Sequence, residues 1–178
     1  MSIYMPMSTT GRHNRMVMTI SSAVIELLRK KEVYALQEEC ALVHWGYKGK
    51  SDFKELIKIA DIENKSIFVE ETINELDYIQ PDFLLFKDNP YLHNENETKV
   101  AGCPDLIIEV WSKGNTKAER EFKLELYSSS PVTEHWYIEQ DSNEVICYFG
   151  KEKTKSQSLK NVLETRGGLK FDLRYLAI

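Results

Sequence analysis

The chain begins with a helical repeat of apolar side chains. Residues 12–31 carry them at the spacing of three and four that is typical of an amphipathic helix. The repeat consists of Met16, Ile20, Val24, Leu27 and Leu28. Thr9 or Thr10 precedes it as a suitable N-cap, and basic residues stand at its far end. We therefore predict a first helix that packs its apolar face on a sheet.

Strand-like runs occupy the next part of the chain. Residues 33–45 are rich in Val, Tyr, Leu and Ala and predict a strand, and residues 66–72 predict a short second one. The run LDYIQPDFLLF at 76–86 predicts a third strand. This strand must begin, bulge or lie at a sheet edge at Pro81, because proline donates no hydrogen bond to a ladder. Between the first two strands, residues 48–60 place apolar side chains on one helical face and predict a short inserted helix.

The middle of the chain combines a polar segment, an apolar strand and a helix. Residues 87–102 are polar and turn-rich and predict a long loop. The run PDLIIEVW at 104–111 is the most apolar in the chain and predicts a strand at the centre of the sheet. Residues 117–127 predict a helix whose start is marked by a capping box of Thr116 and Glu119. Its inward face is predicted to carry three apolar residues, Ala118, Phe122 and Leu126.

The C-terminal part of the chain again predicts strands. Residues 134–139 and 144–149 alternate around a polar turn and predict a hairpin. Residues 151–160 are polar and predict an exposed segment. Residues 163–178 predict a closing element with Gly167-Gly168 as its turn.

The order of these elements indicates the fold class. Helix, strands, helix and strands in succession predict one mixed α/β domain with an α+β mixed sheet. At roughly 150 residues per domain, a chain of 178 residues allows one such domain and hardly two. We therefore expect a single domain over residues 1–178, with a small inserted helical segment near 48–62.

Composition limits the class of protein further. Hydrophobic residues make up 42% and charged residues 29% of the chain, which excludes disorder and collagen. No apolar run is long enough for a membrane span, and residues 1–15 lack a signal-peptide pattern. We therefore expect a cytoplasmic protein without a membrane partner. The three cysteines have no CxxC spacing and predict neither a disulfide framework nor a zinc site.

The distribution of charge along the chain is more informative about function than the net charge. The net charge of −5 argues against a protein that holds nucleic acid by bulk positive charge alone. Negative charge is concentrated in residues 63–110, which carry 3 basic and 11 acidic side chains. Such a segment is either solvated surface or a site for a divalent cation, and both interpretations stay open at this point.

Two Pro-Asp pairs open the apolar strands, at Asp82 and Asp105, and Glu109 follows within the second strand. If the strands pair as an antiparallel hairpin in which paired residue numbers add up to 191, Asp82 lies opposite Glu109. Opposed residues have Cβ atoms about 5 Å apart, close enough for two carboxylates to share one Mg²⁺ or Mn²⁺ ion. Asp105 would lie about 13 Å from Glu109 along the strand, too far to bind the same ion.

Lys123 is the lysine best placed to serve such a pair. In the predicted helix it shares a stripe with Glu119 and Tyr127, at four-residue spacing. It could orient or deprotonate the attacking water and stabilise charge on a phosphate. Structural interpretations also exist, since Asp after Pro starts turns, Glu119 caps the helix, and Lys123 can pair with Glu119. Glu109 is the exception, because a carboxylate inside an apolar strand is costly unless it is paired or ligated.

Four motifs of the chain, taken in order, resemble those of one bacterial family: IQPDFLLF, GCPDLIIEVWS, EREFKLELY and EHWYIE. The chain resembles the Uma-type family of putative restriction endonucleases, a branch of the PD-(D/E)xK nuclease superfamily. The resemblance runs from His13 to the final FDLRYLAI. It implies a restriction-endonuclease-like core of helix, three strands, helix and strands, and magnesium-dependent hydrolysis of DNA phosphodiester bonds.

The resemblance also implies roles for individual residues. Asp82 matches the family's first strand carboxylate and Glu109 matches the acidic residue of its (D/E)xK element, and both would bind the metal. Trp111 stands two residues after Glu109, where a lysine is expected, and Lys123 matches a helix lysine that replaces it. The rim of the implied site consists of Asp105, Glu119, Tyr127 and His13.

Three functional hypotheses follow from these residues. The first is a metal-dependent endonuclease, in which Asp82 and Glu109 bind Mg²⁺ or Mn²⁺ and Lys123 supports the reaction. DNA is its expected substrate, and a homodimer is expected because a two-fold protein suits a two-fold substrate. The second is a catalytically inactive module on the same fold that binds nucleic acid or protein, which the sparse basic charge and Trp111 favour. The third is an assembly partner whose carboxylates are structural.

Overall fold

The structure is a computed structural model, and it describes residues 11–31, 33–37, 41–43, 78–88, 91–93, 99–102, 104–129, 134–154 and 156–178. The predicted helix at 48–60, the predicted strand at 66–72 and the predicted caps Thr9 and Thr10 lie outside these residues. The inserted segment near 48–62 and the extent of the domain over 1–178 therefore stay predictions.

The described elements form two helices, two sheets and a small hairpin. The helices are α1 (Gly11–Arg29) and α3 (Lys117–Ser129), with the 3-10 helix η2 (Arg174–Leu176) near the C-terminus. The larger sheet contains β1 (Tyr34–Gln37), β4 (Phe83–Phe86), β7 (Leu106–Trp111), β8 (Glu134–Glu139), β9 (Glu144–Phe149), β10 (Glu152–Lys153) and β11 (Gln157–Ser158). The smaller sheet contains β2 (Ala41–Val43), β3 (Tyr78–Ile79), β5 (Tyr91–His93) and β6 (Lys99–Gly102), and the hairpin consists of β12 (Leu163–Glu164) and β13 (Lys170–Phe171). Among the described residues, no helix combines the length and the apolar character that a membrane span requires.

Strand β7 lies at the centre of the larger sheet, as its apolar sequence predicts. The strand order is β1-β4-β7-β8-β9-β10, and β11 also pairs with β9. β7 is antiparallel to β4 and parallel to β8, and all six of its residues are buried. Any polar side chain in β7 must therefore find its partners inside the protein.

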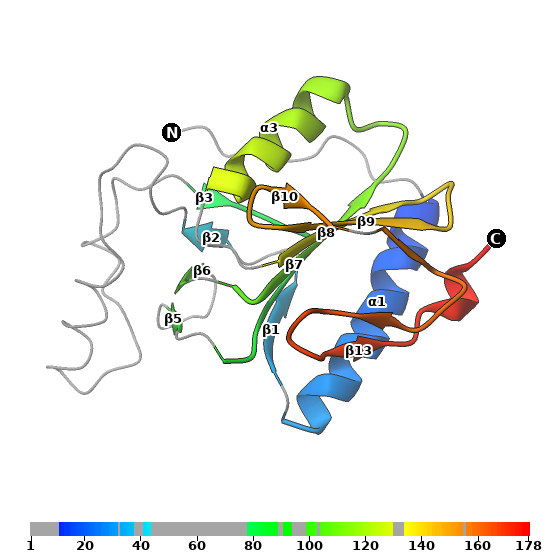
Figure 1. Cartoon of the computed structure of the whole chain (residues 1–178). Coiled ribbons are helices and arrows are strands. Elements are labelled where there is room, and N and C mark those ends of the chain that lie inside the picture. The colour runs from blue at the N-terminus through cyan, green and yellow to red at the C-terminus, as the bar shows by residue number, and fades with distance from the viewer. Residues whose placement is uncertain are drawn as a thin grey trace, which may run out of the picture.

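The two long helices cover opposite faces of the larger sheet (Figure 1). Leu106 and Ile108 of β7 share a core cluster with the apolar stripe of α1. Ile107 and Trp111 belong to a second cluster that contains buried residues of α3. Because side chains alternate along a strand, Glu109 lies on the α3 face.

Two predicted strands are wrong in extent, because each is divided between the two sheets. The strand predicted at 33–45 consists of β1, which pairs with β4, and β2, which pairs with β3. The strand predicted at 76–86 consists of β3 and β4, with Pro81 between them. Proline cannot continue a hydrogen-bonded ladder, so the chain leaves one sheet and enters the other at this point. The long loop predicted at 87–102 is also wrong, because it contains β5 and β6, which pair with each other.

Helix α1 follows its prediction except at one position. Its buried side chains include Met16, Ile20, Val24 and Leu27, so the predicted apolar stripe is confirmed. Leu28 was expected in the same stripe but is 38% exposed. Leu27 occupies the inward position at that turn, and its neighbour therefore points away from the sheet.

Helix α3 forms where predicted but turns a different face inward. Ala118 and Phe122 are exposed, although both were predicted to point toward the core. Leu126 is buried, as predicted, but the other buried side chains of α3 are a polar stripe of Glu119, Lys123 and Tyr127. This polar stripe faces inward because α3 covers the side of the sheet that carries Glu109.

The C-terminal region contains the predicted hairpin at 134–149, and the closing element predicted at 163–178 includes a second hairpin. β8 and β9 pair antiparallel, and β12 and β13 pair across a turn in which Gly168 has a φ of 82°, a value that favours glycine. The exposed segment predicted at 151–160 is confirmed only in part: residues 151–153 and Lys160 are exposed, whereas residues 156–158 are half-buried, and β10 and β11 both pair with β9. Leu159 is fully buried and ties this segment to the α1 side of the sheet.

Candidate active site

The register between β4 and β7 places two carboxylates opposite each other. Phe83 pairs with Ile108 in the antiparallel ladder. Continued by one residue, this register sets Asp82, which stands just before β4, opposite Glu109. The predicted register, in which paired residue numbers add up to 191, is therefore confirmed.

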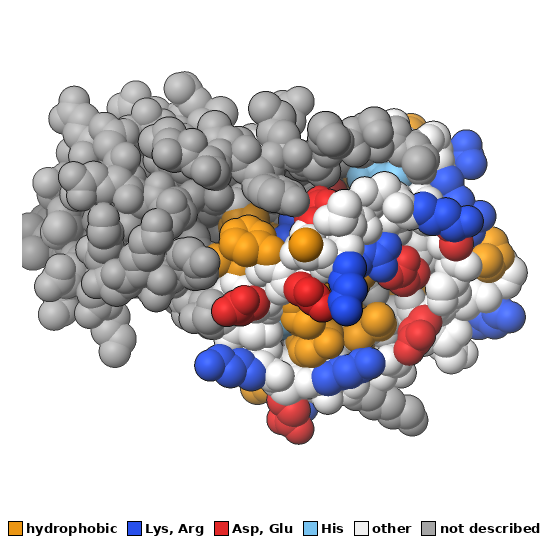
Figure 2. All heavy atoms as spheres, turned by 90° about the horizontal axis from the view of Figure 1, so that it is seen from above, with side chains coloured by type: hydrophobic (Ala, Val, Ile, Leu, Met, Phe, Trp, Pro, Cys, Tyr) orange, Lys and Arg blue, Asp and Glu red, His pale blue; other side chains and the backbone are white. Residues whose placement is uncertain are grey.

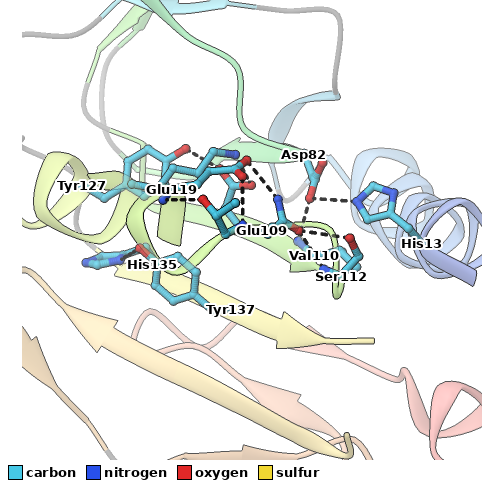
Figure 3. A network of polar contacts seen from close by, with 12 residues as sticks. His13, Asp82, Glu109, Val110, Ser112, Glu119, Tyr127, His135 and Tyr137 are labelled. Atoms are coloured by element: carbon cyan, nitrogen blue, oxygen red, sulfur yellow. Dashed lines mark hydrogen bonds and ion pairs between the residues drawn. The ribbon is translucent and has the colours of Figure 1, made fainter. Parts of the chain in front are cut away.

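Asp82 is buried and is held from two sides. Its Oδ2 accepts a hydrogen bond of 2.6 Å from the backbone amide of Val110. The same oxygen lies 3.6 Å from Nε2 of His13, which approaches from α1 (Figure 3). Both contacts are on Oδ2, and within the described part of the chain no hydrogen bond or ion pair reaches Oδ1.

Glu109 uses both of its carboxylate oxygens. Oε2 lies 2.7 Å from Nζ of Lys123, and Oε1 accepts a hydrogen bond of 2.5 Å from the hydroxyl of Tyr127. All three side chains are buried, and the two partners lie one helical turn apart on α3. The helix thus supplies one cation and one neutral donor to the same carboxylate.

Burial and neighbouring charges shift the pKa values of Glu109 and Lys123. Burial raises the pKa of Glu109 to about 7; the Lys123 ammonium opposes this shift and the charge of Asp82 adds to it. Burial, the largest single effect, would lower the pKa of Lys123. The charge of Glu109 and its hydrogen bond, together with the charges of Asp82 and Glu119, outweigh burial, so the pKa of Lys123 lies above its ordinary value of 10.5. Lys123 is therefore a cation at neutral pH.

Glu119 forms a capping box with Thr116 at the N-terminus of α3. Its backbone amide donates to Oγ1 of Thr116 over 3.2 Å, and its Oε2 accepts from the Thr116 amide over 3.3 Å. The predicted capping box is confirmed. Glu119 also accepts a hydrogen bond of 3.0 Å from the side-chain amide of Asn115. Lys123 makes its close ion pair with Glu109, and the alternative pairing with Glu119 is not formed.

Asp105 stands at the end of β7 that is remote from the ion pair. Its Oδ2 accepts hydrogen bonds from the backbone amides of Lys87, at 2.7 Å, and Asp88, at 3.2 Å. Asp105 thereby holds the turn that follows β4. Four residues separate it from Glu109 along an extended strand, so the two carboxylates do not meet, as the sequence predicts.

Trp111 fills the strand position at which the resemblance places a lysine. Its ring packs on Tyr137, with ring centroids 4.2 Å apart, and the guanidinium of Arg120 lies 4.8 Å from its centroid. Arg120 is held there by an ion pair with Glu139. An aromatic side chain thus occupies the strand position, and the cation of the site, Lys123, comes from the helix.

A layer of polar aromatic side chains on the α3 face was not predicted. Nε2 of His135 lies 2.9 Å from the carbonyl of Gly150 and therefore carries the proton, so Nδ1 accepts the hydroxyl of Tyr137 over 2.8 Å. Burial lowers the pKa of His135 to about 4, and the ring is neutral. The only signal in the sequence is the His-x-Tyr spacing, which puts both side chains on one face of a strand.

The carboxylate oxygens of Asp82 and Glu109 suit one hard cation, whose remaining ligands would not come from the described part of the protein. Both side chains offer oxygen donors only, and the charge of Asp82 raises the pKa of Glu109, so a shared cation would relieve their repulsion. The described residues contain no group of three or more His, Cys, Asp or Glu side chains that could hold a metal ion. Mg²⁺ is commonly bound by one or two carboxylates, while waters and substrate phosphates complete its shell.

Comparisons with known proteins identify the family and the fold of the chain. The sequence matches the model of the Uma2 family, described as "Putative restriction endonuclease", over residues 62–172, which include both carboxylates and Lys123. A comparison with curated proteins found no match. Among solved structures, the chain is similar to "a putative nuclease belonging to DUF820" from Anabaena variabilis ATCC 29413. The TM-score is 0.64 at 13% sequence identity, over 98% of this chain and 87% of the other, which shows a shared fold.

The predicted fold class and the predicted family are thus both confirmed. The structure is a mixed α/β fold of the kind seen in that solved protein. The family match covers more than half of the residues, including β4, β7 and α3. The chain therefore belongs to the Uma2 family.

Proposed function

We propose that this chain is a divalent-cation-dependent endonuclease that hydrolyses DNA phosphodiester bonds. The observation that carries the proposal is the meeting of Asp82 and Glu109 across two strands, with the Lys123 ammonium beside them. Membership in the Uma2 family supports a nuclease. The requirement for a metal, the choice of DNA and the roles of the three residues belong to the proposal.

Asp82 and Glu109 would hold Mg²⁺ or Mn²⁺ in this proposal. When bound, the cation would supply Lewis-acid stabilisation of the phosphate oxygens and lower the pKa of the attacking water. The Val110 amide and His13 hold Asp82 through Oδ2, which leaves Oδ1 as the oxygen directed at a ligand. Both carboxylates are thereby oriented before any substrate arrives.

Lys123 would supply the positive charge that belongs to the chain itself. Because its pKa is raised, the ammonium stays protonated at neutral pH and is a poor general base. Its role is to orient the attacking water and to stabilise the negative charge that develops on the phosphate. Lys123 lies on α3 one turn from Tyr127, and this position keeps its ammonium beside Oε2 of Glu109.

Cleavage of supercoiled plasmid DNA tests the proposal. We expect the wild type to cleave with Mg²⁺ or Mn²⁺ and to stop when a chelator is added. Asp82→Asn, Glu109→Gln and Lys123→Met are each expected to lose activity by about 100-fold or more. Circular dichroism of each variant checks that the fold is retained.

Glu134→Gln is the matched control for these substitutions. Glu134 is also a buried carboxylate in a strand of the larger sheet, but it accepts a hydrogen bond of 2.7 Å from the indole of Trp136 on the α1 face. We expect this variant to cleave DNA like the wild type. Full activity of Asp82→Asn, or cleavage that does not need a metal, would contradict the proposal.

A second candidate function is a module on the same fold that binds nucleic acid or protein without cleaving. Both oxygens of Glu109 already have partners, so a metal must compete with Lys123 for one of them. On the described part of the α3 side, basic and acidic side chains are interspersed and form no continuous basic area (Figure 2). Binding of DNA in a gel-shift assay, with no cleavage in the presence of Mg²⁺ or Mn²⁺, would favour this alternative.

We also propose that the nuclease acts as a homodimer. Two active sites related by a two-fold axis would allow both DNA strands to be cut in one binding event, because the symmetry of the protein would match that of the duplex. Light scattering coupled to size-exclusion chromatography of the full chain measures the oligomeric state directly. A monomer at all concentrations tested would contradict this part of the proposal.

A further inference from the structure

Tyr127 makes the shortest contact with the carboxylate pair. Its hydroxyl lies 2.5 Å from Oε1 of Glu109, and its side chain is fully buried. Burial raises the pKa of Tyr127 well above 10, and the charge of Glu109 adds to this, so the hydroxyl keeps its proton. Glu109 thus has a permanent neutral donor on one oxygen and a cation, Lys123, on the other.

The ring of Tyr127 is held by the polar aromatic layer beside it. It packs against the ring of His135 in an edge-type arrangement, with centroids 5.9 Å apart. His135 is stacked on Tyr148 at 5.1 Å and is anchored to the carbonyl of Gly150. A phenylalanine ring at position 127 would keep these packing contacts and lose only the hydroxyl.

Tyr137 provides a comparison within the same layer. It is fully buried on the same face of the sheet as Tyr127. Its hydroxyl donates to Nδ1 of His135, however, and not to a carboxylate. Removal of either hydroxyl therefore takes a buried hydrogen bond from the described core, but the bond to Glu109 is lost only with the hydroxyl of Tyr127.

We propose that Tyr127 is a positioning residue for the metal site, because its hydroxyl fixes Oε1 of Glu109 and thereby presents Oε2 to a divalent cation. This inference rests on the proposed function. A carboxylate that is bound at one oxygen cannot rotate freely, so Oε2 keeps its direction when Lys123 releases it. Partners that orient a metal ligand in this way typically contribute about 10- to 100-fold to metal affinity.

Isothermal titration calorimetry with Mn²⁺ tests the role of Tyr127 on the full chain. We expect Tyr127→Phe to bind Mn²⁺ about 10-fold more weakly than the wild type, or weaker still. The control Tyr137→Phe is expected to stay within about twofold of the wild type, because its hydroxyl does not contact a ligand. A merely structural role would lower the thermal stability of both variants and leave both affinities unchanged, which would overturn the inference.

Glu109→Gln separates failure of this inference from failure of the proposed function. If the wild type binds Mn²⁺, Glu109→Gln does not, and Tyr127→Phe binds like the wild type, only the role of Tyr127 is refuted. If the wild type does not bind, or if Glu109→Gln binds equally well, the proposed function fails and the inference fails with it.

A measurement on the unmodified side chain covers the case in which Tyr127→Phe does not fold. A tyrosine labelled with ¹³C at Cζ and placed at position 127 alone reports its hydrogen bond through its NMR chemical shift. We expect the shift of a hydrogen-bonded phenol to persist when Mg²⁺ saturates the protein. A change to the shift of a free phenol on addition of Mg²⁺ would overturn the inference.

Discussion

Lys123 of α3 and Glu109 of β7 form an ion pair inside the protein, with Nζ 2.7 Å from Oε2 and the two side chains 7% and 2% exposed. Such a pair adds little net stability, because the loss of hydration offsets the attraction between the charges. Removal of one partner destabilises the protein, since it leaves the other charge buried and unpaired. To stay ionised inside the protein, Glu109 therefore requires a counter-charge, which can be an ammonium or a metal ion; without one it takes up a proton.

Substitution of Lys123 by methionine tests whether a metal ion can replace the ammonium as the counter-charge of Glu109. We expect Lys123→Met to lower the free energy of unfolding of the metal-free protein by up to about 3–5 kcal/mol, because Glu109 loses its counter-charge. Mn²⁺ should then raise the melting temperature more in the variant than in the wild type, since the ion no longer competes with an ammonium. Melting curves with and without Mn²⁺ measure both effects. Equal shifts in the two proteins would show that Lys123 and the metal do not compete.

The coupling between the two carboxylates makes a prediction about protonation. The charge of Asp82 is one of the causes that raise the pKa of Glu109 to about 7. Asp82→Asn removes this charge, and we expect the pKa of Glu109 to fall below that value. An NMR titration of ¹³C-labelled glutamate carboxyl groups measures it, with Glu134→Gln as the control. An unchanged pKa would mean that the two carboxylates do not interact.

His135 should make the stability of the protein depend on pH in a defined window. Its pKa is about 4 in the folded protein, against an ordinary value of 6.5, so the unfolded chain takes up the proton first as the pH falls. The stability that neutral His135 contributes is therefore complete above about pH 6.5 and is lost as the pH falls to about 4. Within this window we expect the contribution of His135 to the free energy of unfolding to rise by about 1.4 kcal/mol per pH unit.

The measurement for His135 is a difference between two proteins. Urea unfolding of the wild type and of His135→Gln is followed from about pH 4 to pH 8. The opposite trend of Glu109, whose raised pKa lowers stability as the pH rises from 4.5 to about 7, is present in both and cancels. The difference in unfolding free energy should grow with pH and level off near 6.5. A constant difference would refute the assignment of a neutral, buried His135.

The capping box of α3 should contribute to stability in a graded way. Thr116→Ala removes the side-chain acceptor for the Glu119 amide, and we expect it to cost about 1 kcal/mol of unfolding free energy. Thr116→Ser keeps the hydroxyl and should stay close to the wild type. Urea denaturation of the three proteins measures the series. A serine variant as unstable as the alanine variant would show that the hydroxyl is not the source of the effect.

The sequence was sufficient to predict the carboxylate pair and the helix cap. Pro81 limits where β4 can begin, and Glu109 is the one charged side chain within the apolar strand PDLIIEVW after its opening Asp. These two features are compatible with an antiparallel register that sets Asp82 opposite Glu109, and this register is the one observed. The cap was predictable because both of its partners lie within one turn of the same helix.

The inward face of α3 could not be predicted from the helix alone. Phe122 is more apolar than Lys123, yet Phe122 is 39% exposed and Lys123 is buried. The reason lies in the surface that the helix covers, where Glu109 requires a cation and a hydrogen-bond donor. In the same way, the division of residues 33–45 between two sheets depends on partner strands that lie far along the chain.

The break at Pro81 gives the two carboxylates unequal surroundings. Glu109 belongs to β7, whose pairing with β4 ends at Ile108, but Glu109 itself pairs with Tyr137 of β8, so β8 holds its backbone. Asp82 sits at a corner, between β3 of one sheet and β4 of the other. A sequence change or a ligand that shifts the smaller sheet will therefore alter the spacing of the pair through Asp82, while Glu109 serves as its fixed point.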